Sequence, residues 1–290
     1  GVNAMTPDIT FVLTIGTQFI TIAKTAEYRL VSYSGIEAAD IILDIADNGS
    51  ADGGYLQSER VGTRTITLAF KIDDKTRTEQ LRAWLIKFFA PKQDATLTVT
   101  RTGVTRTINC KLAARPEFVQ GNMMRDRLGV TVNLICPDPY FYDTAGTEQR
   151  FLTYTPVLNF PMTSIVNVGA TSGILTVTDT ITLVNDGDAP IGIVCDITAS
   201  GGSVTNPKVT VNSGDYVKVL KAMVRYDVVT VDTRERLKNI YVNNVAAFIF
   251  DRNSVFFSVP VGTNTIKISA DTGLTNATAT VSYALKYLGV

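Results

Sequence analysis

The sequence feature that most constrains the fold is a break in the middle of the chain, Cys136-Pro137-Asp138-Pro139. Proline has no N–H to donate to a strand ladder, and it biases the preceding residue toward extended geometry, so a strand must stop here. Strand-like segments lie on both sides of the break. Because 290 residues exceed the roughly 250 at which single cores stop growing, we expect two β modules, residues 5–142 and 143–290, joined by a stiff elbow.

Charge and the absence of histidine exclude several classes of function. The 27 basic residues are balanced by 27 acidic ones, so no net field favours nucleic acid or an anionic membrane. Without imidazole there is no Ser-His-Asp or Cys-His arrangement and no HExxH zinc helix. We predict that the chain is not an enzyme and that it binds no cofactor or metal.

Cys110, Cys136 and Cys195 are scattered and odd in number, unlike a disulfide scaffold or a CxxC metal site. We expect buried, reduced thiols. There is no run of about 20 apolar residues and no basic region followed by an apolar run at the N-terminus. The sequence therefore predicts a soluble protein made in a cytoplasm.

The first module reads as strands of period two. Residues 65–72 place Ile66, Leu68, Phe70 and Ile72 on one face, which predicts a half-buried strand. Residues 96–100 and 108–112 show the same alternation around a turn at 102–103, which predicts a hairpin. Residues 130–136 continue the pattern as far as the elbow.

One helix is expected in this module. Thr76-Arg77-Thr78-Glu79 has capping-box spacing, and Pro91 ends the segment. Between them the apolar residues recur at helical spacing and indicate a core-facing stripe: Leu81, Trp84, Leu85, Phe88 and Phe89.

The second module contains no comparable helical pattern. Short alternating segments are separated by turn residues at the spacing of an antiparallel β-sandwich, of jelly-roll or lectin-like type. The expected strands are 181–184, 191–197, 208–211, 216–220, 228–231, 254–259, 265–268 and a long closing strand over 277–287.

Two polar segments have competing interpretations. Residues 48–54 are glycine-rich but lack the lysine and the strand-to-helix context of a phosphate loop, which favours a mobile hairpin tip. Asn185-Asp186-Gly187-Asp188 offers oxygen ligands for calcium without EF-hand spacing, which favours a tight turn whose residues tolerate positive φ.

Aromatic residues raise two further questions. Tyr140, Phe141 and Tyr142 stand beside the elbow, and we expect them either to pack between the two domains or to anchor a partner. Aromatic residues of the second module raise the question of sugar stacking: Tyr216, Tyr226, Tyr241, Phe256 and Phe257.

In this order the motifs resemble the distal tail proteins, or Dit family, of long-tailed siphovirus-type bacteriophages and prophages. The resemblance covers nearly the whole chain. It rests on Ser34-Gly35-Ile36, the tip at 48–54, the strand at 64–70, Phe88-Phe89-Ala90-Pro91, Cys136-Pro137-Asp138-Pro139-Tyr140-Phe141, Asn185-Asp186-Gly187-Asp188-Ala189-Pro190, residues 228–233 and residues 261–266.

The resemblance implies a tail-tube-like N-terminal β-sandwich or split barrel with one α-helix, followed by a galectin-like C-terminal β-sandwich. It further implies a homohexameric ring at the virion tail tip that connects the tail tube protein to the tail-associated lysin or hub protein. The ring would carry receptor-binding proteins for host attachment and let DNA pass without specific binding, with no contact to a membrane. The alternative function is a lectin-like, carbohydrate-binding adsorption protein.

The resemblance also suggests that the extended hairpin helps contact between subunits, through Asn48, Gly49, Asp52, Gly53, Gly54 and Tyr55. We also hypothesise from the residues that the N-terminal sheet continues from one subunit to the next, because exposed strand edges can join sheets between chains.

Overall fold

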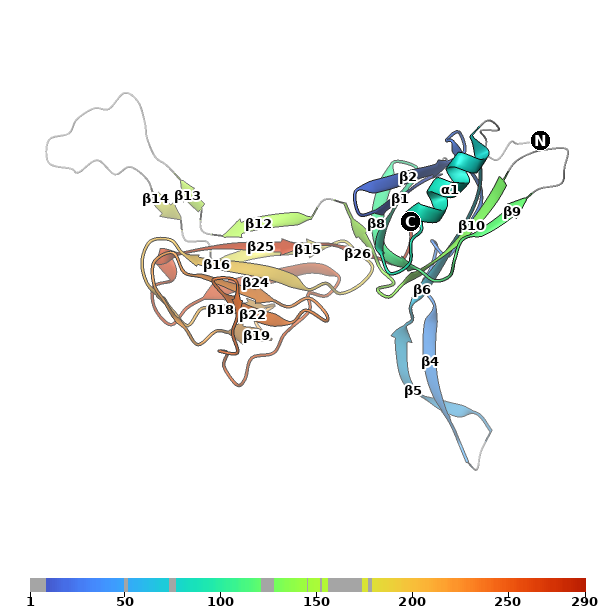
Figure 1. Ribbon diagram of the computed structural model, residues 1–290. Helices are drawn as coiled ribbons and strands as arrows, with labels where there is room; N and C mark the ends of the chain where they lie inside the picture. Colours follow the sequence, from blue (N-terminus) through green and yellow to red (C-terminus); the bar gives the residue numbers. More distant parts are fainter. Residues whose placement is uncertain are drawn as a thin grey trace, which may run out of the picture. The chain divides into compact units, whose positions relative to one another are not determined.

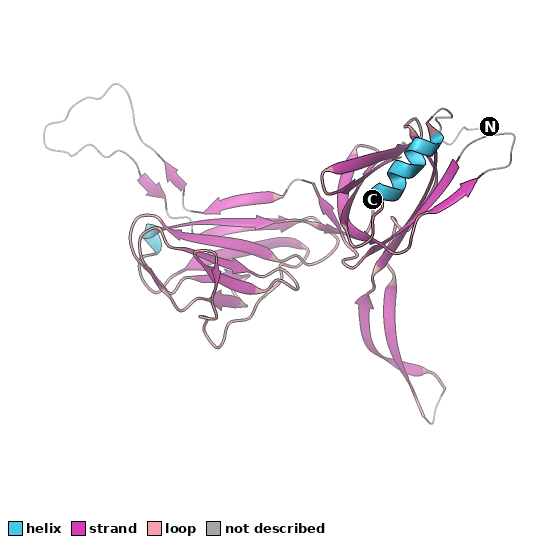
Figure 2. Cartoon of the chain, in the orientation of Figure 1, coloured by secondary structure: helices cyan, strands magenta, loops and turns pink. Residues whose placement is uncertain are grey.

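The computed structural model describes residues 9–49, 52–72, 77–120, 128–144, 146–151, 153–155, 174–176 and 179–290. In this part of the chain nearly all regular structure is β, with a single α-helix (Figures 1 and 2). The predicted mainly-β fold class is confirmed. No helix in these residues has the length and apolarity needed to cross a bilayer.

The chain divides into two compact units. Unit 1 contains residues 1–144 together with 286–290, and unit 2 contains residues 145–285. The expected boundary lies between residues 142 and 143 and assigns the whole C-terminus to the second domain. The structure differs at the end of the chain, because the last five residues pair with and are bound by unit 1.

Unit 1 is built on one large sheet whose central part closes on itself. Its order is β26-β11-β8-β7-β1-β2-β3-β6-β10-β9, and an added pairing of β8 with β10 at Leu134↔Leu112 and Ile135↔Lys111 makes a barrel-like ring. β2 and β3 are parallel, and the other pairs are antiparallel. The elements of unit 1 are β1 (Ile9–Ile15), β2 (Gln18–Ala23), β3 (Tyr28–Ser34), β4 (Ile41–Asp47), β5 (Gly54–Val61), β6 (Arg64–Ile72), α1 (Thr78–Phe88), β7 (Asp94–Arg101), β8 (Val104–Leu112), β9 (Glu117–Gln120), β10 (Leu128–Cys136), β11 (Phe141–Asp143) and β26 (Lys286–Tyr287).

The predicted strands and hairpin of this unit are confirmed. β6 and β10 bury every second residue, because one face of each strand looks into the core and successive side chains alternate between faces. β7 and β8 pair through the turn at Thr102-Gly103, as the alternation predicts. β1, β2 and β3 are further strands of this unit, in addition to those predicted from the alternation.

The helix α1 packs with its apolar stripe on the core. Leu85, Phe88 and Phe89 are buried, and Trp84 stacks between Phe88 at 5.0 Å and Tyr28 at 6.4 Å between ring centroids. The capping-box prediction is wrong in its N-cap: the N-cap is Arg77, which makes no side-chain cap hydrogen bond, and Thr76 lies outside the described residues.

Unit 2 is a sandwich of two antiparallel sheets around one core. The sheets are β12-β25-β16-β21-β22-β23 and β15-β24-β18-β19, and buried residues of both share one cluster. The elements are β12 (Thr147–Phe151), β13 (Thr153–Thr155), β14 (Ile174–Thr176), β15 (Thr180–Asn185), β16 (Ile193–Ala199), β17 (Val204–Thr205), β18 (Lys208–Val211), β19 (Tyr216–Lys218), β20 (Ala222–Met223), β21 (Val228–Asp232), β22 (Asn239–Val242), β23 (Val245–Ala246), β24 (Gly262–Ser269), the 3₁₀ turn η1 (Leu274–Asn276) and β25 (Ala277–Tyr283).

Two strand predictions in the second half are wrong. The long closing strand over 277–287 ends at Tyr283, and β26 then pairs with β11 of unit 1. Residues 254–259 make only an isolated bridge, Val259 to Ile191, although Phe257 and Val259 are buried. In both places the alternation of apolar residues correctly indicates which side chains are buried. A strand also requires an adjacent strand whose backbone groups accept and donate its hydrogen bonds.

The three cysteines are free and buried, as predicted. Cys110 and Cys136 share the core of unit 1, where a hydrogen bond from one thiol to the other, together with burial, raises the pKa of Cys110. Cys195 lies in the core of unit 2, and burial raises its thiol pKa as well. The hydrogen bond from Cys110, with a smaller contribution from the charge of Arg64, lowers the pKa of Cys136 instead. All three thiols are core groups, and those of Cys110 and Cys195 are held in their neutral form.

Candidate assembly surfaces

The most exposed element of unit 1 is the hairpin of β4 and β5, here called the arm. Every residue of these two strands is exposed except Ala46, which is half-buried. The arm extends away from the barrel as a separate two-stranded sheet (Figure 1). A ribbon of two strands is at best marginally stable by itself in water, so this arm is a candidate for contact with another chain.

The two faces of the arm differ in polarity. Cross-strand pairs share a face, and the pairs Ile41↔Val61, Leu43↔Glu59 and Ile45↔Leu56 therefore form one face with five aliphatic side chains. The opposite face carries the pairs Ile42↔Arg60, Asp44↔Ser58 and Ala46↔Tyr55. A register shift between Asp44 and Ile45 keeps the aliphatic residues of β5 on the first face.

The predicted tip residues lie at the end of the arm. The N–H of Asn48 donates to the carbonyl of Gly53 at 3.2 Å and closes the turn. Gly53 has φ of 89°, and a Cβ on Gly54 would lie 2.7 Å from the carbonyl oxygen of Ala46, so both positions require glycine. These residues thus form a hairpin tip, as predicted, and its mobility stays a prediction; Ser50 and Ala51 lie outside the described part of the chain.

The remaining predicted tip residues, Tyr55, Asp52 and Gly49, add an aromatic side chain and a carboxylate to the tip. Tyr55 faces Ala46 across the arm and is 55% exposed, and Asp52 and Gly49 are exposed on the turn. Their contribution to contact between subunits stays a prediction.

Arg64 anchors the root of the arm. It is the first residue of β6, only 1% exposed, and its guanidinium donates to the carbonyls of Gly35 and Pro139, both at 2.8 Å, and to that of Leu288. Its Cζ also lies 5.0 Å from the ring centroid of Phe141. Burial lowers the pKa of Arg64, but a guanidinium remains charged in a protein. One side chain thus ties the arm root to the elbow and to the C-terminus.

The predicted aromatic cluster makes contacts within unit 1. Phe141 is fully buried in the core of this unit. The hydroxyl of Tyr142 donates to Asp138 at 2.6 Å, and the ammonium of Lys286 lies 5.0 Å from the ring centroid of Tyr140. Tyr140 and Tyr142 are half-buried, and the partner-binding role stays a prediction.

The C-terminal tail, residues 286–290, is bound along its length. β26 pairs with β11, Arg106 stacks 3.6 Å from the ring centroid of Tyr287, and the Arg106 guanidinium donates to the carbonyl of Gly289. The N–H of Val290 donates to Ile36 at 3.2 Å, and Arg101 donates to the carbonyl of Val290 at 3.0 Å. The tail therefore belongs to the framework of unit 1.

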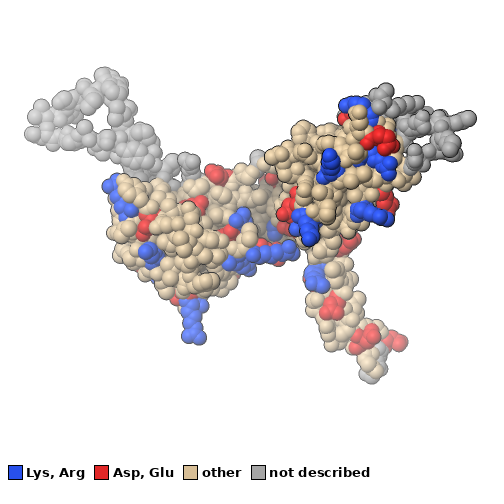
Figure 3. All heavy atoms as spheres, in the orientation of Figure 1, with Lys and Arg blue, Asp and Glu red and all other residues tan. Residues whose placement is uncertain are grey.

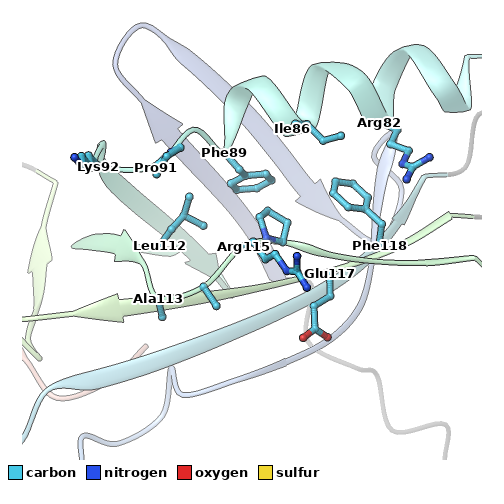
Figure 4. A pocket seen from close by; sticks show the side chains of 12 residues that line it. Arg82, Ile86, Phe89, Pro91, Lys92, Leu112, Ala113, Arg115, Glu117 and Phe118 are labelled. Carbon is cyan, nitrogen blue, oxygen red and sulfur yellow. The ribbon is translucent and has the colours of Figure 1, made fainter.

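A groove of about 920 Å³ opens between α1 and the connection from β8 to β9, and we call it the α1 groove (Figure 4). Phe89, Leu112 and Phe118 line it with apolar surface. Arg82 stands at one end, with its Cζ 5.7 Å from the ring centroid of Phe118. The remaining lining residues are Ile86, Pro91, Lys92, Ala113, Ala114, Arg115, Pro116 and Glu117.

The polar turn of unit 2 is anchored from within. Asn185 is buried, its amide donates to the carbonyls of Ala189, Val259 and Pro260 at 3.1–3.2 Å, and its Oδ1 accepts from the N–H of Gly187. None of residues 185–188 has positive φ, so the expected left-handed geometry is wrong. Among the described residues there is no cluster of three metal-ligating side chains. The arrangement is that of a structural turn.

The aromatic residues of unit 2 differ in exposure. Phe257 is buried, and Phe256 packs at 82° against Phe250. The ring of Tyr216 is covered by the Lys208 ammonium at 3.8 Å, and Tyr226 is 71% exposed. Tyr241 is half-buried in β22. Carbohydrate binding by these rings stays a prediction.

The described residues form a mainly β protein with an exposed arm, and comparisons with known proteins show what it is similar to. Residues 186–287 match the family model of the siphovirus-type tail component, C-terminal domain. The Dit protein (gp 19.1) of phage SPP1 matches with a TM-score of 0.65 and 15% identity, over 96% of this chain and 99% of that chain. That protein is described as a paradigm of the hub adsorption apparatus in phages that infect Gram-positive bacteria.

Chains of the phage P2 baseplate are similar too. The match to the structure of the activated baseplate with Ca covers 99% of this chain and 100% of that chain. The match to the activated baseplate with Sr covers 97% of this chain and 99% of that chain. Both have a TM-score of 0.50 and 10% identity. No curated protein sequence matches the chain. The family-model match over residues 186–287 and the structural match over nearly the whole chain both support the resemblance to the Dit family seen in the sequence.

Sequence reasoning missed three of the features described above. Arg64 was recognisable, because it stands two residues before Ile66 on the buried face of β6. The docking of the tail and the α1 groove had no local signal, because each forms from segments that are distant in the sequence.

Proposed function

We propose that six copies of this chain form a ring at the distal end of a phage tail, with unit 1 as the ring wall. One face of the ring contacts the tail tube protein, and the other contacts the tail-associated lysin or hub protein. The observation that carries this proposal is the match to a Dit structure over nearly the full length of both chains. The exposed arm supports it, since a two-stranded ribbon is marginally stable by itself and a partner on its aliphatic face would stabilise it.

In this proposal unit 2 carries receptor-binding proteins, and its role in host attachment is indirect. DNA passes through the lumen without specific binding, because phosphate contacts from Lys and Arg would retain it, and the chain has no net charge. The proposed role includes no catalysis. The chain would be made in the cytoplasm of the host bacterium, from a phage or prophage genome, and would act at the tail tip.

Negative-stain microscopy and light scattering of the purified chain at micromolar concentration test the ring. We expect six-fold particles with a mass near six times 31.4 kDa. Particles that remain monomeric up to the highest soluble concentration would contradict spontaneous ring formation.

A shortened arm provides the matched test of its role. Deleting residues 48–54 and joining β4 to β5 by a two-residue turn removes the tip but leaves the barrel intact. We expect fewer rings with an unchanged fluorescence spectrum of Trp84, the single tryptophan, which packs in the core of unit 1. An unchanged oligomer mass would show that the tip does not contribute.

A further inference from the structure

The aliphatic face of the arm lacks cover in the described part of this chain. Ile41, Leu43 and Ile45 of β4 are each more than half exposed, and so is Leu56 of β5. Large apolar side chains gathered on one face of a projecting element are typical of a contact surface. We therefore expect the aliphatic face of the arm to be covered by an apolar surface from outside the arm.

The α1 groove has the matching chemistry. Its floor of Phe89, Leu112 and Phe118 is apolar, and Figure 4 shows these side chains turned into the space between α1 and the β8–β9 connection. Ile86 of α1 adds an exposed aliphatic side chain at the edge. A volume of about 920 Å³ is large enough for several side chains of a ribbon.

The charges of the two surfaces are opposite. Across residues 41–61 the arm has four acidic residues and one base; Figure 3 shows acidic atoms along it. The α1 groove has three bases and one acid. The arm residues are Asp44, Asp47, Asp52, Glu59 and Arg60; the groove residues are Arg82, Lys92, Arg115 and Glu117. Opposite potentials of this kind favour encounter and fix the register of an interface.

We propose that the arm of one copy lies in the α1 groove of a neighbouring copy, with its aliphatic face on the apolar floor and the carboxylates of that face and of the tip, Asp47, Asp52 and Glu59, near the groove cations. The inference rests on the proposed ring and names the surfaces that build it. Arm and groove are different surfaces of one unit, so the contact is head-to-tail, the type that closes into a ring when the rotation per subunit allows. The arm extends away from α1 of its own barrel, which leaves the groove to another copy (Figure 1).

Charge exchange between the two surfaces tests the pairing. One variant carries Asp47→Lys, Asp52→Lys and Glu59→Lys, a second carries Arg82→Glu, Lys92→Glu and Arg115→Glu, and a third carries all six. Each single-surface variant places like charges together, so we expect its ring to dissociate at a concentration at least tenfold higher than wild type. The variant with all six substitutions restores opposite charges on the two surfaces. We expect its ring to dissociate at a concentration within about threefold of the wild-type value.

The control changes the net charge by the same amount away from both surfaces. Arg236→Glu, Lys238→Glu and Arg252→Glu lie at exposed positions of unit 2 and should leave the ring unaffected. Trp84 fluorescence verifies that unit 1 remains folded in every variant.

Cross-linking provides a second measurement. A Leu43→Cys chain mixed with an Ile86→Cys chain should give a covalent dimer with a short bis-maleimide, while either variant alone should not. The three native thiols are buried.

If the wild-type chain forms a ring but this cross-link does not form, or if the ring persists in both charge variants, the arm-in-groove contact is overturned and the proposed ring is not. If the variant with all six substitutions does not regain ring formation, the pairing is also overturned. A wild-type chain that never forms a ring overturns both proposals.

Discussion

Arg64 joins three segments that are far apart in the sequence. Its guanidinium donates to carbonyls from the end of β3, from the elbow and from the C-terminal tail, and so connects Gly35, Pro139 and Leu288. A buried carbonyl that loses its donor costs about 1–3 kcal/mol, more when the donor is charged. The side chain also fills space against Phe141. Its position on the buried face of β6 makes it a structural cation.

Replacing Arg64 should destabilise unit 1 selectively. We expect Arg64→Met to lower the free energy of unfolding by about 3–5 kcal/mol, because one buried and two partly buried carbonyls lose a charged donor. Urea denaturation followed by Trp84 fluorescence measures unit 1 alone. Arg60→Met on the exposed arm is the matched control, with an expected change below about 0.5 kcal/mol. Equal effects of the two substitutions would contradict the role of Arg64.

At the scale of elements, the C-terminal tail shows how tertiary pairing divides a continuous pattern. Residues 277–287 alternate throughout, but β25 pairs with β16 and β12 in unit 2, whereas β26 pairs with β11 in unit 1. The tail then runs so close to the chain after β3 that a Cβ on Gly289 would lie 1.8 Å from the carbonyl oxygen of Glu37. Docking of this tail thus depends on a residue without a side chain.

Gly289→Ala tests this close approach. The added methyl group must displace backbone, so we expect the tail to dock less well and unit 1 to lose about 1–3 kcal/mol of stability. Gly146→Ala is the control, because its Cβ would meet nothing closer than 4.0 Å. Hydrogen exchange at the N–H of Val290, which donates to Ile36, reports the docking directly. Unchanged protection in Gly289→Ala would contradict the steric argument.

At the scale of the molecule, unit 2 is an insertion between two adjacent strands of unit 1. The chain leaves unit 1 after Thr144 and returns at Lys286, and β11 and β26 pair directly through Tyr142↔Lys286. Each unit has its own core cluster, which is the property that lets a domain fold by itself.

Removal of the insertion should leave unit 1 folded. We expect a chain in which a short Asn-Gly turn replaces residues 145–285 to keep the Trp84 unfolding transition within about 1 kcal/mol of the full-length chain. Truncation after Thr144 is the matched comparison and should be less stable, since Arg64, Arg101 and Arg106 then lose acceptors in the tail. If both chains unfold alike, the tail does not contribute to unit 1.

Local sequence patterns are sufficient to predict much of the secondary structure of this protein. Period-two alternation placed β6, β7, β8 and β10, helical spacing placed α1, and glycines placed the tip of the arm, because these signals depend on neighbours along the chain. The same patterns wrongly predict one strand over 254–259 and one continuous strand over 277–287. They also do not indicate the structural role of Arg64. Three features depend instead on long-range pairing and packing: the closing of the barrel at Leu134↔Leu112, the return of the tail to β11, and the α1 groove. Each of these joins segments separated by many residues, and such pairing depends on hydrogen-bond partners and packing that no local pattern encodes.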